Sequence, residues 1–531
     1  MRKSNILIVS ALLSGLLFTA TGCKKFLDVN KTPNNLTFTK ADWVMTGALG
    51  TSMRIQYGGS HIVLGTWTGM YAHSTSFTGG GNEKTYSFTN SDFNFFNEAY
   101  DNLQDYQYVI QNADKDGVGF WKDPADVMQC LVFQRLVDMY GDVPYTEAFQ
   151  GVNNISPKYD KQKDIYEDLI KRLDKDIANM KAATWPLSGD FTKQDIFFAL
   201  NKTNWIKFAN TIKLRILMRQ SFMPGRDSYI SSNILTTVGE GYISTNVLCK
   251  PGYQNIAGKL NPFYSTYGYN EVGNVLGNHQ YRKMNRVIIN WLKTSSLDTF
   301  RLQSLAWPSG STPTAPLPTA PPSPNSLSAY VGVPLGVGSG FSTAGSSPIG
   351  PFQIVRGTST RPAIFMTAAE SYLLQAEAVL RYPAVATAIG VSAQTLYETG
   401  ILTHFRLCAD PTQETPAANQ GDAAYNRYIN RPINNVNWAV TTDHIRGVLI
   451  QKWVALVHVN GLEAWSEYRK SSGSTTTPTY YGLPSTPLSV VASSPDEPVR
   501  LFYPLNEENT NGNNVPKGID VFTSKIFWDV N

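Results

Sequence analysis

Apolar positions recur every three or four residues over long stretches of this chain, which is the pattern of amphipathic helices. In the clearest stretch, residues 165–180, the apolar side contains Ile165, Leu169, Leu173 and Ile177. Charged residues fill the positions between them. We therefore predict an amphipathic helix here.

Two further stretches in the first half of the chain have helical patterns. Residues 125–140 are apolar nearly all round, which predicts a buried central helix. Residues 203–220 carry an apolar stripe that includes Trp205 and Phe208. We interpret the basic residues of this stretch as a solvated face, and as partners for neighbouring acids, rather than as a ligand site: Lys207, Lys213, Arg215 and Arg219.

The second half predicts helices over 363–381 and 448–470, with Gly461 as a kink or an end within the latter. Small residues between Ala369 and Ala378 are compatible with close packing in tetratricopeptide-like hairpins, although no strict repeat is visible. Between the two halves, residues 308–351 are rich in Pro, Ser, Thr and Gly. We expect this segment to be a long loop on or near the helical body, with too little apolar surface to order itself.

The final stretch, residues 499–531, is rich in Asn and Pro. It reads as an extended segment that wraps the surface.

The N-terminus has the organisation of an export signal. A cationic start precedes an apolar run over residues 6–18, which is shorter than the ~20 residues of a membrane span. The run ends in Ala20-Thr21-Gly22-Cys23, which resembles a bacterial lipobox, except that such boxes usually have Leu at the position of Ala20. We predict a lipoprotein signal peptide over 1–22, lipidation of Cys23 and a polar tether over 23–40. An ordinary secretory signal peptide is the alternative.

The composition limits the classes of function. The chain has 45 Lys and Arg against 41 Asp and Glu, which argues against nucleic acid as the natural partner. Aromatic residues make up 12% of it, with 11 Trp and 27 Tyr. Some must lie in the core, and aromatic side chains left at a surface bind flat, amphipathic ligands.

Motifs for catalysis are missing from the sequence. The six histidines form no H-E-x-x-H pair, and neither a phosphate-binding loop nor a G-x-S-x-G elbow is present. Two carboxylate pairs, Asp142 with Glu147 and Glu463 with Glu467, are interpreted as helix caps or salt-bridge partners. We predict no catalytic residue, no metal ligand and no cofactor, and leave a structural Ca²⁺ open.

Besides Cys23, the cysteines are Cys130, Cys249 and Cys408, at wide spacings that do not suggest a disulfide framework. Cys130 lies in an apolar helical stretch and is predicted to be a small core residue. A bridge between Cys249 and Cys408 is left open.

Aromatic residues gather in two loop-like regions, residues 57–96 and 264–282, among Gly, Ser, Thr and Asn. A pyranose ring has an apolar face and a polar rim, so it suits aromatic faces with amide or guanidinium groups nearby. The alternative for any single ring is that it fills the interface between loop and helix. The candidate ligand-binding residues are Trp67, Tyr71, Tyr86, Tyr264, Tyr267, Tyr269, Asn270, Tyr281 and Arg282.

Several segments, taken in order along the chain, resemble the SusD/RagB family of outer-membrane nutrient-binding lipoproteins of Bacteroidetes, in particular its second SusD-like subgroup. No single segment is specific, but together they extend from residue 23 to residue 529. They are Cys23–Asn30, Tyr140–Ala148, Lys207–Asn210, Asn261–Tyr264, Met366–Glu370, Gln375–Ala378, Gln451–Leu456, Gly461–Trp465, Arg500–Pro504 and Phe527–Asp529.

The resemblance implies a mainly α-helical domain over 41–531, built from tetratricopeptide-like helix pairs with long irregular loops packed on one side. It also implies a lipid-anchored binding protein of the outer membrane that is not an enzyme. Such a protein covers a TonB-dependent transporter of the SusC type and passes captured oligosaccharides to it. Lys24 and Lys25 depart from the acidic residues that often follow the lipidated cysteine, and they leave the membrane leaflet open.

Three other functions are kept beside oligosaccharide uptake. Peptide capture within the same kind of transport system is one, since an aromatic groove with amide groups also suits an extended chain. A surface hydrolase and an adhesive helical-repeat protein are the others.

Overall fold

The apolar pattern of residues 165–180 forms helix α7 (Gln162–Ala182), whose apolar side is buried as predicted. Helix α6 (Lys122–Tyr140) is buried around most of its circumference, which confirms its predicted central position. Helix α9 (Lys202–Arg219) begins where the side chain of Asn201 accepts a hydrogen bond from the backbone N–H of Asn204, the usual role of Asn as an N-cap.

The structure is a computed structural model. The predicted signal peptide, Cys23 and most of the tether lie outside the described residues. Among the helices that are described, none is both long and apolar enough to cross a membrane. The residues described are 39–78, 81–186, 191–311, 324–471 and 497–530.

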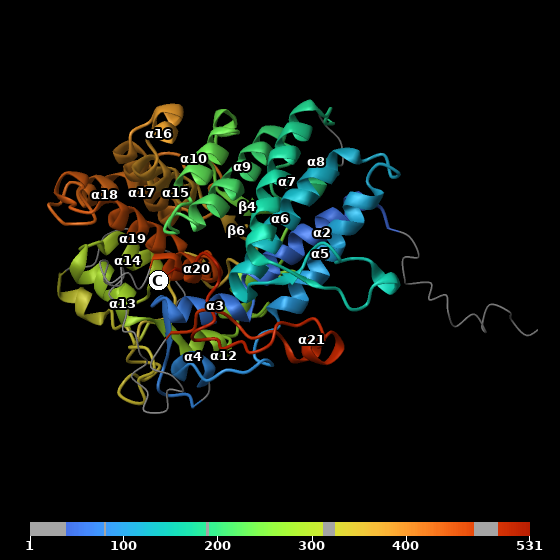
Figure 1. The fold of residues 1–531 in the computed structure, drawn as a ribbon. Helices are drawn as coiled ribbons and strands as arrows, with labels where there is room; N and C mark the ends of the chain where they lie inside the picture. The colour runs from blue at the N-terminus through green and yellow to red at the C-terminus, as the bar shows by residue number, and fades with distance from the viewer. Residues whose placement is uncertain (1–38, 79–80, 187–190, 312–323, 472–496, 531) are drawn as a thin grey trace, which may run out of the picture. The chain divides into compact units, whose positions relative to one another are not determined.

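Helices of the first half pack in succession, each against the next in the chain (Figure 1). This is the arrangement of helix-hairpin repeats, in which each unit contacts its neighbours. The helices in order are α2 (Ala41–Gln56), α5 (Phe95–Asn112), α6, α7, α9 and α10 (Asp227–Leu235).

The second half continues this array. Helix α15 (Ala368–Arg381) packs on α9 and also contacts α16, α17 and α19. The mainly α-helical fold with tetratricopeptide-like pairs is therefore confirmed. The remaining helices of this half are α16 (Pro383–Ile389), α17 (Ala393–Ala409), α18 (Gln420–Ile429), α19 (His444–Leu456) and α20 (Gly461–Ser471).

Shorter helices and irregular segments occupy the side of the array where α3, α12 and α21 lie (Figure 1). These short helices are α3 (Gly59–Trp67), α4 (Gly81–Thr85), α11 (Pro262–Tyr267), α12 (Gly277–Tyr281), α13 (Arg286–Asn290), α14 (Thr299–Leu305) and α21 (Leu505–Thr510). The short helix α8 (Phe191–Gln194) instead packs against α2. The 3-10 helices are η1 (Gly119–Trp121), η2 (Gly151–Asn153), η3 (Val238–Glu240), η5 (Pro324–Ala329) and η6 (Trp438–Val440), and η4 (Trp291–Ser295) is a π-helical segment.

Strands in the described residues pair only in twos, and every pair is antiparallel. Strand β1 pairs with β5, β2 with β3, and β4 with β6. The strands are β1 (Tyr71–His73), β2 (Val143–Pro144), β3 (Tyr159–Asp160), β4 (Val247–Cys249), β5 (Arg282–Met284) and β6 (Ala363–Met366).

Two predicted helices of the second half differ from their expected bounds. The first residues of 363–381 form strand β6, because they pair with β4, and the helix begins after Thr367. The stretch 448–470 is divided into α19 and α20, and Gly461 begins the second of these helices.

The predicted loop 308–351 is ordered in its described C-terminal part. Tyr330, Val333, Leu335 and Ile349 are buried there, and Val333 and Ile349 form isolated β-bridges. The expectation of too little apolar surface is wrong for this part, because a few apolar side chains spaced along the segment each enter the core.

The prediction for the basic residues of α9 holds in part: Lys213, Arg215 and Arg219 pair with acids as expected, but only Lys207 of the four is partly exposed, so the solvated face is wrong for the other three. Lys213, Arg215 and Arg219 are all at most 2% exposed. Arg215 pairs with Glu370, and Arg219 pairs with Glu467 at 2.6 Å. The partners come from α15 and α20, helices more than 100 residues away, so the apolar pattern of α9 alone could not reveal that this face is covered.

The C-terminal stretch follows its prediction in part. It contains the single short helix α21 among its described residues and is otherwise irregular. It does more than wrap the surface, since Leu501, Tyr503 and Trp528 are buried. The indole N–H of Trp528 donates to the carboxylate of Asp138 at 3.0 Å, which fixes the end of the chain to α6.

Candidate functional site

The pairing of β1 with β5 brings the two predicted aromatic regions together. Tyr71 lies opposite Met284, and His73 lies opposite Arg282 in this short ladder. Residues 57–96 and 264–282 therefore meet on the irregular side of the molecule, although about 200 residues separate them in sequence. Sequence reasoning located both regions but could not show that they touch.

Most of the rings in the candidate set are buried in this meeting place. The exposed fraction is at most 2% for each of Trp67, Tyr71, Tyr86, Tyr264, Tyr267 and Tyr269. A ring with so little exposed surface packs against protein and presents no face to a sugar in this conformation. These six side chains belong to the core that holds the loops to the helices.

Their hydroxyl groups show the same role. The Tyr267 hydroxyl donates to the carbonyl of Gly58 at 2.8 Å, and the hydroxyl of Tyr264 accepts from the N–H of Gly357 at 3.2 Å. The hydroxyl oxygen of Tyr71 lies 2.9 Å from Nδ1 of the buried His458. Because buried phenols need a hydrogen-bond partner, each of these contacts helps to fix one loop position.

Trp67 shows how the buried rings hold the loop-rich side of the molecule to the helical array. Its ring packs edge-on against Trp465 of α20 at a centroid distance of 5.4 Å, and against Tyr86 at 6.0 Å. It also contacts Phe88 at 5.2 Å. This aromatic cluster joins α3 to α20.

Asn270 has a local backbone role. Its side-chain carbonyl accepts hydrogen bonds from the N–H groups of Val272 at 3.2 Å and Asn274 at 2.8 Å. This is the way Asn stabilises a turn. Asn270 therefore shapes the loop between α11 and α12.

Tyr281 differs from the other aromatic candidates, because it is only partly buried. Its ring stacks on His73 at 5.2 Å with an interplanar angle of 26°, and lies 5.6 Å from the partly exposed ring of Phe77. Its hydroxyl donates to the side-chain carbonyl of Asn278. We call Phe77, Asn278, Gln280 and Tyr281 the Tyr281 patch.

The described end of the 308–351 loop borders this patch. The backbone N–H of Thr75 donates to the carbonyl of Phe341 at 2.7 Å, and the N–H of Thr343 donates to the hydroxyl of Ser76 at 3.0 Å. Three segments that are distant in sequence thus meet around Tyr281.

The buried guanidinium of Arg282 contacts the Tyr281 patch on its inner side. Arg282 pairs with both carboxylate oxygens of Glu83, one of them at 2.6 Å, and its guanidinium lies 4.9 Å from the centroid of the Tyr281 ring. Burial, together with the positive charge of Arg282, lowers the pKa of His73 to about 2. His73 is therefore neutral at physiological pH, and its contact with Glu83 is a hydrogen bond rather than an ion pair. Arg282 positions Tyr281 from inside the protein.

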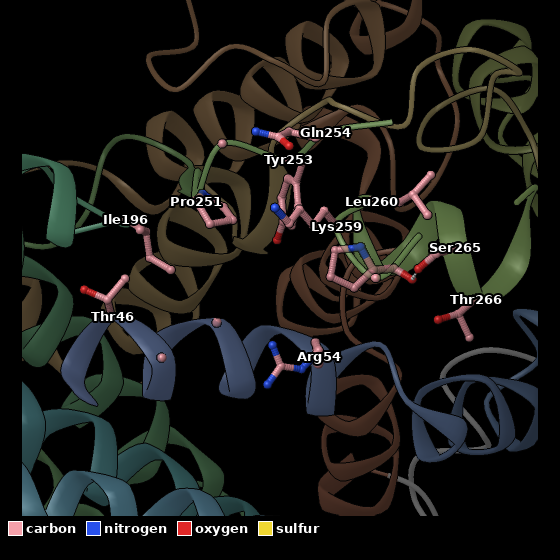
Figure 2. Close-up of a pocket in the computed structure, with 15 residues that line it drawn as sticks. Thr46, Arg54, Ile196, Pro251, Tyr253, Gln254, Lys259, Leu260, Ser265 and Thr266 are labelled. Atoms are coloured by element: carbon pink, nitrogen blue, oxygen red, sulfur yellow. Dashed lines mark hydrogen bonds between the residues drawn. The ribbon is translucent and has the colours of Figure 1, made fainter. Parts of the chain in front are cut away.

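A cavity of about 600 Å³ lies beside α11 (Figure 2). Helix α2 forms one wall with Thr46 and Arg54, and the segment 251–260 with Tyr253 and Lys259 forms the opposite wall (Figure 2). None of the residues lining this groove is acidic. We call it the Arg54 groove. It has the size of a small-molecule site and carries two positive charges.

Sequence reasoning did not find the Arg54 groove, although Ser265 and Thr266, which line it, are neighbours of the predicted Tyr264 and Tyr267. The signal was weak because its walls come from helix α2 and from a loop 200 residues later. Glycines on the α2 wall, Gly47 and Gly50, also leave no side-chain pattern to recognise.

The carboxylate pairs considered for hydrolysis are structural. Asp142 accepts a hydrogen bond from the N–H of Gln162 at 3.0 Å at the start of α7, and Glu147 accepts from the N–H of Lys158 at 3.0 Å. Glu463 and Glu467 are buried and pair with Arg219. None of these four acids lines the Arg54 groove.

The cysteines of the described residues are free and buried, so Cys249 and Cys408 are not bridged in this structure. Burial raises the pKa of each of these two thiols to about 12. Cys130 is fully buried on α6, as predicted for a core residue. It is also part of a group that the sequence did not reveal, in which its sulfur lies close to carboxylates of Asp126 and Asp176.

An array of helix pairs, with a loop-rich face on which partly exposed aromatic rings lie among amides, defines a helical-repeat protein. The chain belongs to the SusD-like family, described as starch-binding and associating with the outer membrane, whose model matches residues 33–504. The resemblance seen in the sequence is thereby confirmed. This is a family of nutrient- and carbohydrate-binding proteins of the outer membrane.

Solved structures share this fold over nearly their whole length. A chitin-binding protein is 24% identical and covers 92% of this chain and 99% of its own, with a TM-score of 0.68. A chitin-binding SusD homologue from Flavobacterium johnsoniae is 21% identical over 92% of this chain and 99% of its own, with a TM-score of 0.65. A SusD homologue from Bacteroides thetaiotaomicron is 20% identical over 93% and 100%, with a TM-score of 0.66. At these identities the similarity establishes the fold. No curated protein matches the chain.

Proposed function

We propose that this chain captures oligosaccharides at the cell surface and passes them to a TonB-dependent, SusC-like outer-membrane transporter. The proposal includes a lipid anchor at Cys23 and no catalytic activity of its own. Membership of a family that binds carbohydrate at the outer membrane supports it. So does the lipobox-like N-terminus.

The single observation that carries the proposal is the Tyr281 patch. Tyr281 and Phe77 are partly exposed on the irregular side, where the two aromatic regions meet. A pyranose can place its C–H face on such rings while its hydroxyl groups reach an amide such as that of the exposed Gln280. The stack on His73 and the charge of Arg282 below hold the Tyr281 ring in place before a ligand binds.

Oligomers of N-acetylglucosamine are the first ligands to test, because two of the structural relatives are named as chitin-binding. Maltooligosaccharides are the second, because the family is described as starch-binding. Isothermal titration calorimetry of the purified chain with both series would measure binding.

The decisive variant is Tyr281→Ala. We expect it to weaken oligosaccharide binding at least tenfold, or about 1.4 kcal/mol, because the stacking surface is lost. The matched control is Tyr372→Ala, which removes another partly exposed tyrosine on α15. Equal affinity of the wild type and Tyr281→Ala would remove the patch from the proposal, and release of shorter sugars from the ligand would overturn the non-catalytic assignment.

Peptide capture is the second candidate function, and the Arg54 groove favours it. Arg54 and Lys259 offer positive charge for a terminal carboxylate or an acidic side chain, and no acid in the lining opposes them. Titration with acidic and neutral peptides separates the candidates. Peptide binding that Arg54→Ala abolishes, and that Tyr281→Ala does not change, would favour peptide uptake.

A further inference from the structure

Three side chains of the types that bind metals lie close together between helices α6 and α7, away from both the Tyr281 patch and the Arg54 groove. Asp126 and Cys130 lie one turn apart on α6, so they face the same direction, and Asp176 faces them from α7. One oxygen of each carboxylate and the sulfur of Cys130 all lie within 4.8 Å of one another.

The burial of Asp176 is the second observation. Asp176 is 1% exposed, and its Oδ2 atom has no hydrogen-bond partner among the described residues. An unpartnered carboxylate oxygen in a protein interior is costly, so it is usually protonated or bound to a cation. The site thus offers a cation a buried carboxylate oxygen that no protein group occupies.

The charges of the deprotonated ligands fit a divalent ion. Metal binding releases the protons of its ligands, and the three side chains would then carry three negative charges, while Arg172 beside Asp126 supplies one positive charge. Arg172 is held in place by hydrogen bonds of 2.8 Å to both Gln129 and Tyr145. A divalent cation would neutralise the remaining charge. Two acids and two lysines line a cavity beside the three side chains, and their opposite charges cancel: Asp123, Asp168, Lys122 and Lys175.

The two carboxylate oxygens and the sulfur of Cys130 indicate which metal the site would prefer. Ca²⁺ and Mg²⁺ take oxygen ligands, whereas a thiolate with carboxylates suits Zn²⁺. Asp126 and Asp176 also line a cavity of about 540 Å³, from which water can fill a fourth position. Three protein ligands and a water complete the tetrahedral shell that Zn²⁺ prefers.

We propose that Asp126, Cys130 and Asp176 form a binding site for Zn²⁺ that clamps α6 to α7. Small movements of the side chains from their present separation bring the donor atoms to coordination distance. A metal held in the folded chain alone stabilises it, so unfolding shifts to higher temperature in the presence of the ion.

Titration with Co²⁺ tests this site, because a cobalt–thiolate bond gives a near-ultraviolet charge-transfer band that carboxylates do not give. The experiment uses the full chain with Cys23→Ser, so that the N-terminal thiol does not contribute. We expect one equivalent of Co²⁺ to produce the band and one equivalent of Zn²⁺ to abolish it.

Variants identify the ligands. Cys130→Ser should lose the band, Asp176→Asn should weaken Co²⁺ binding at least tenfold, and Cys249→Ser, which alters another buried thiol, should behave as its parent. Asp176→Asn changes no thiol and little volume, so it serves if Cys130→Ser does not fold. The proposal is overturned if the parent chain gives no band, or if both ligand variants keep it. In the first case the two carboxylates share a proton instead.

Discussion

Arg219 is a fully buried arginine that contacts three acids from helices α6 and α20. Its guanidinium lies 2.6 Å from Glu467 and 3.5 Å from Asp138, and also pairs with Glu463. Burial disfavours its charge, but these acids outweigh that effect and raise its pKa. The pairs are stable only as a group, since removal of one member leaves the others charged and desolvated.

We predict that Arg219→Met destabilises the chain by about 3–5 kcal/mol, because three buried carboxylates each lose one cationic partner in the interior. Unfolding in urea, followed by circular dichroism, measures the change. Lys207→Met on the same helix is the control, since Lys207 is partly exposed, and we expect a change below about 0.5 kcal/mol. Similar midpoints for both variants would mean that the ion pairs add no stability.

At the scale of elements, the contact of α3 with α20 depends on one residue without a side chain. Gly461 begins α20, and its N–H donates to Nδ1 of His61 in α3 at 3.1 Å. A Cβ atom at Gly461 would lie 2.0 Å from the backbone carbonyl oxygen of His61. Backbone cannot move aside as a flexible side chain would, so only glycine fits between these helices.

We predict that Gly461→Ala lowers the free energy of unfolding by about 1–3 kcal/mol, as overpacking does elsewhere. Gly47→Ala is the matched control, because a Cβ on this exposed position of α2 meets nothing within 4 Å. That change should leave stability equal or raise it by up to about 1 kcal/mol. Thermal unfolding of both variants checks the pair. An unchanged melting temperature for Gly461→Ala would contradict the close helix contact.

The whole molecule combines a lipobox-like start with a repeat array that spans most of the chain. A diacyl anchor adds ~0.8 kcal/mol of membrane affinity for each buried methylene, enough to hold such a body at a membrane surface. The proposed transfer to a transporter needs this anchor. It also needs the array or the loops to contact the transporter.

We predict that Cys23→Ser moves the chain out of the outer-membrane fraction and abolishes its copurification with a TonB-dependent transporter from the native cell. Immunoblotting of separated membranes, and mass spectrometry of the purified complex, measure the two effects. Cys249→Ser removes a cysteine from the body and should change neither. Retention of the Cys23→Ser chain in the membrane fraction would count against the lipid anchor.

Much of this protein could be predicted from its sequence. Helices such as α6 and α7 have apolar periods strong enough to define them locally, and the family segments fixed the class of fold before any contact was known. Local patterns succeed here because a helix forms its hydrogen bonds within itself and needs only one apolar face to pack.

Tertiary structure decided which residues are accessible. Trp67 and Tyr71 looked like a sugar platform and are core, whereas Tyr281 remains partly exposed. Arg219 looked solvated and is buried. In each case some of the deciding neighbours are distant in sequence, such as Trp465 beside Trp67 and Glu467 beside Arg219. Aromatic and charged side chains can face either water or protein, and only the partners that the fold brings to them determine which they do.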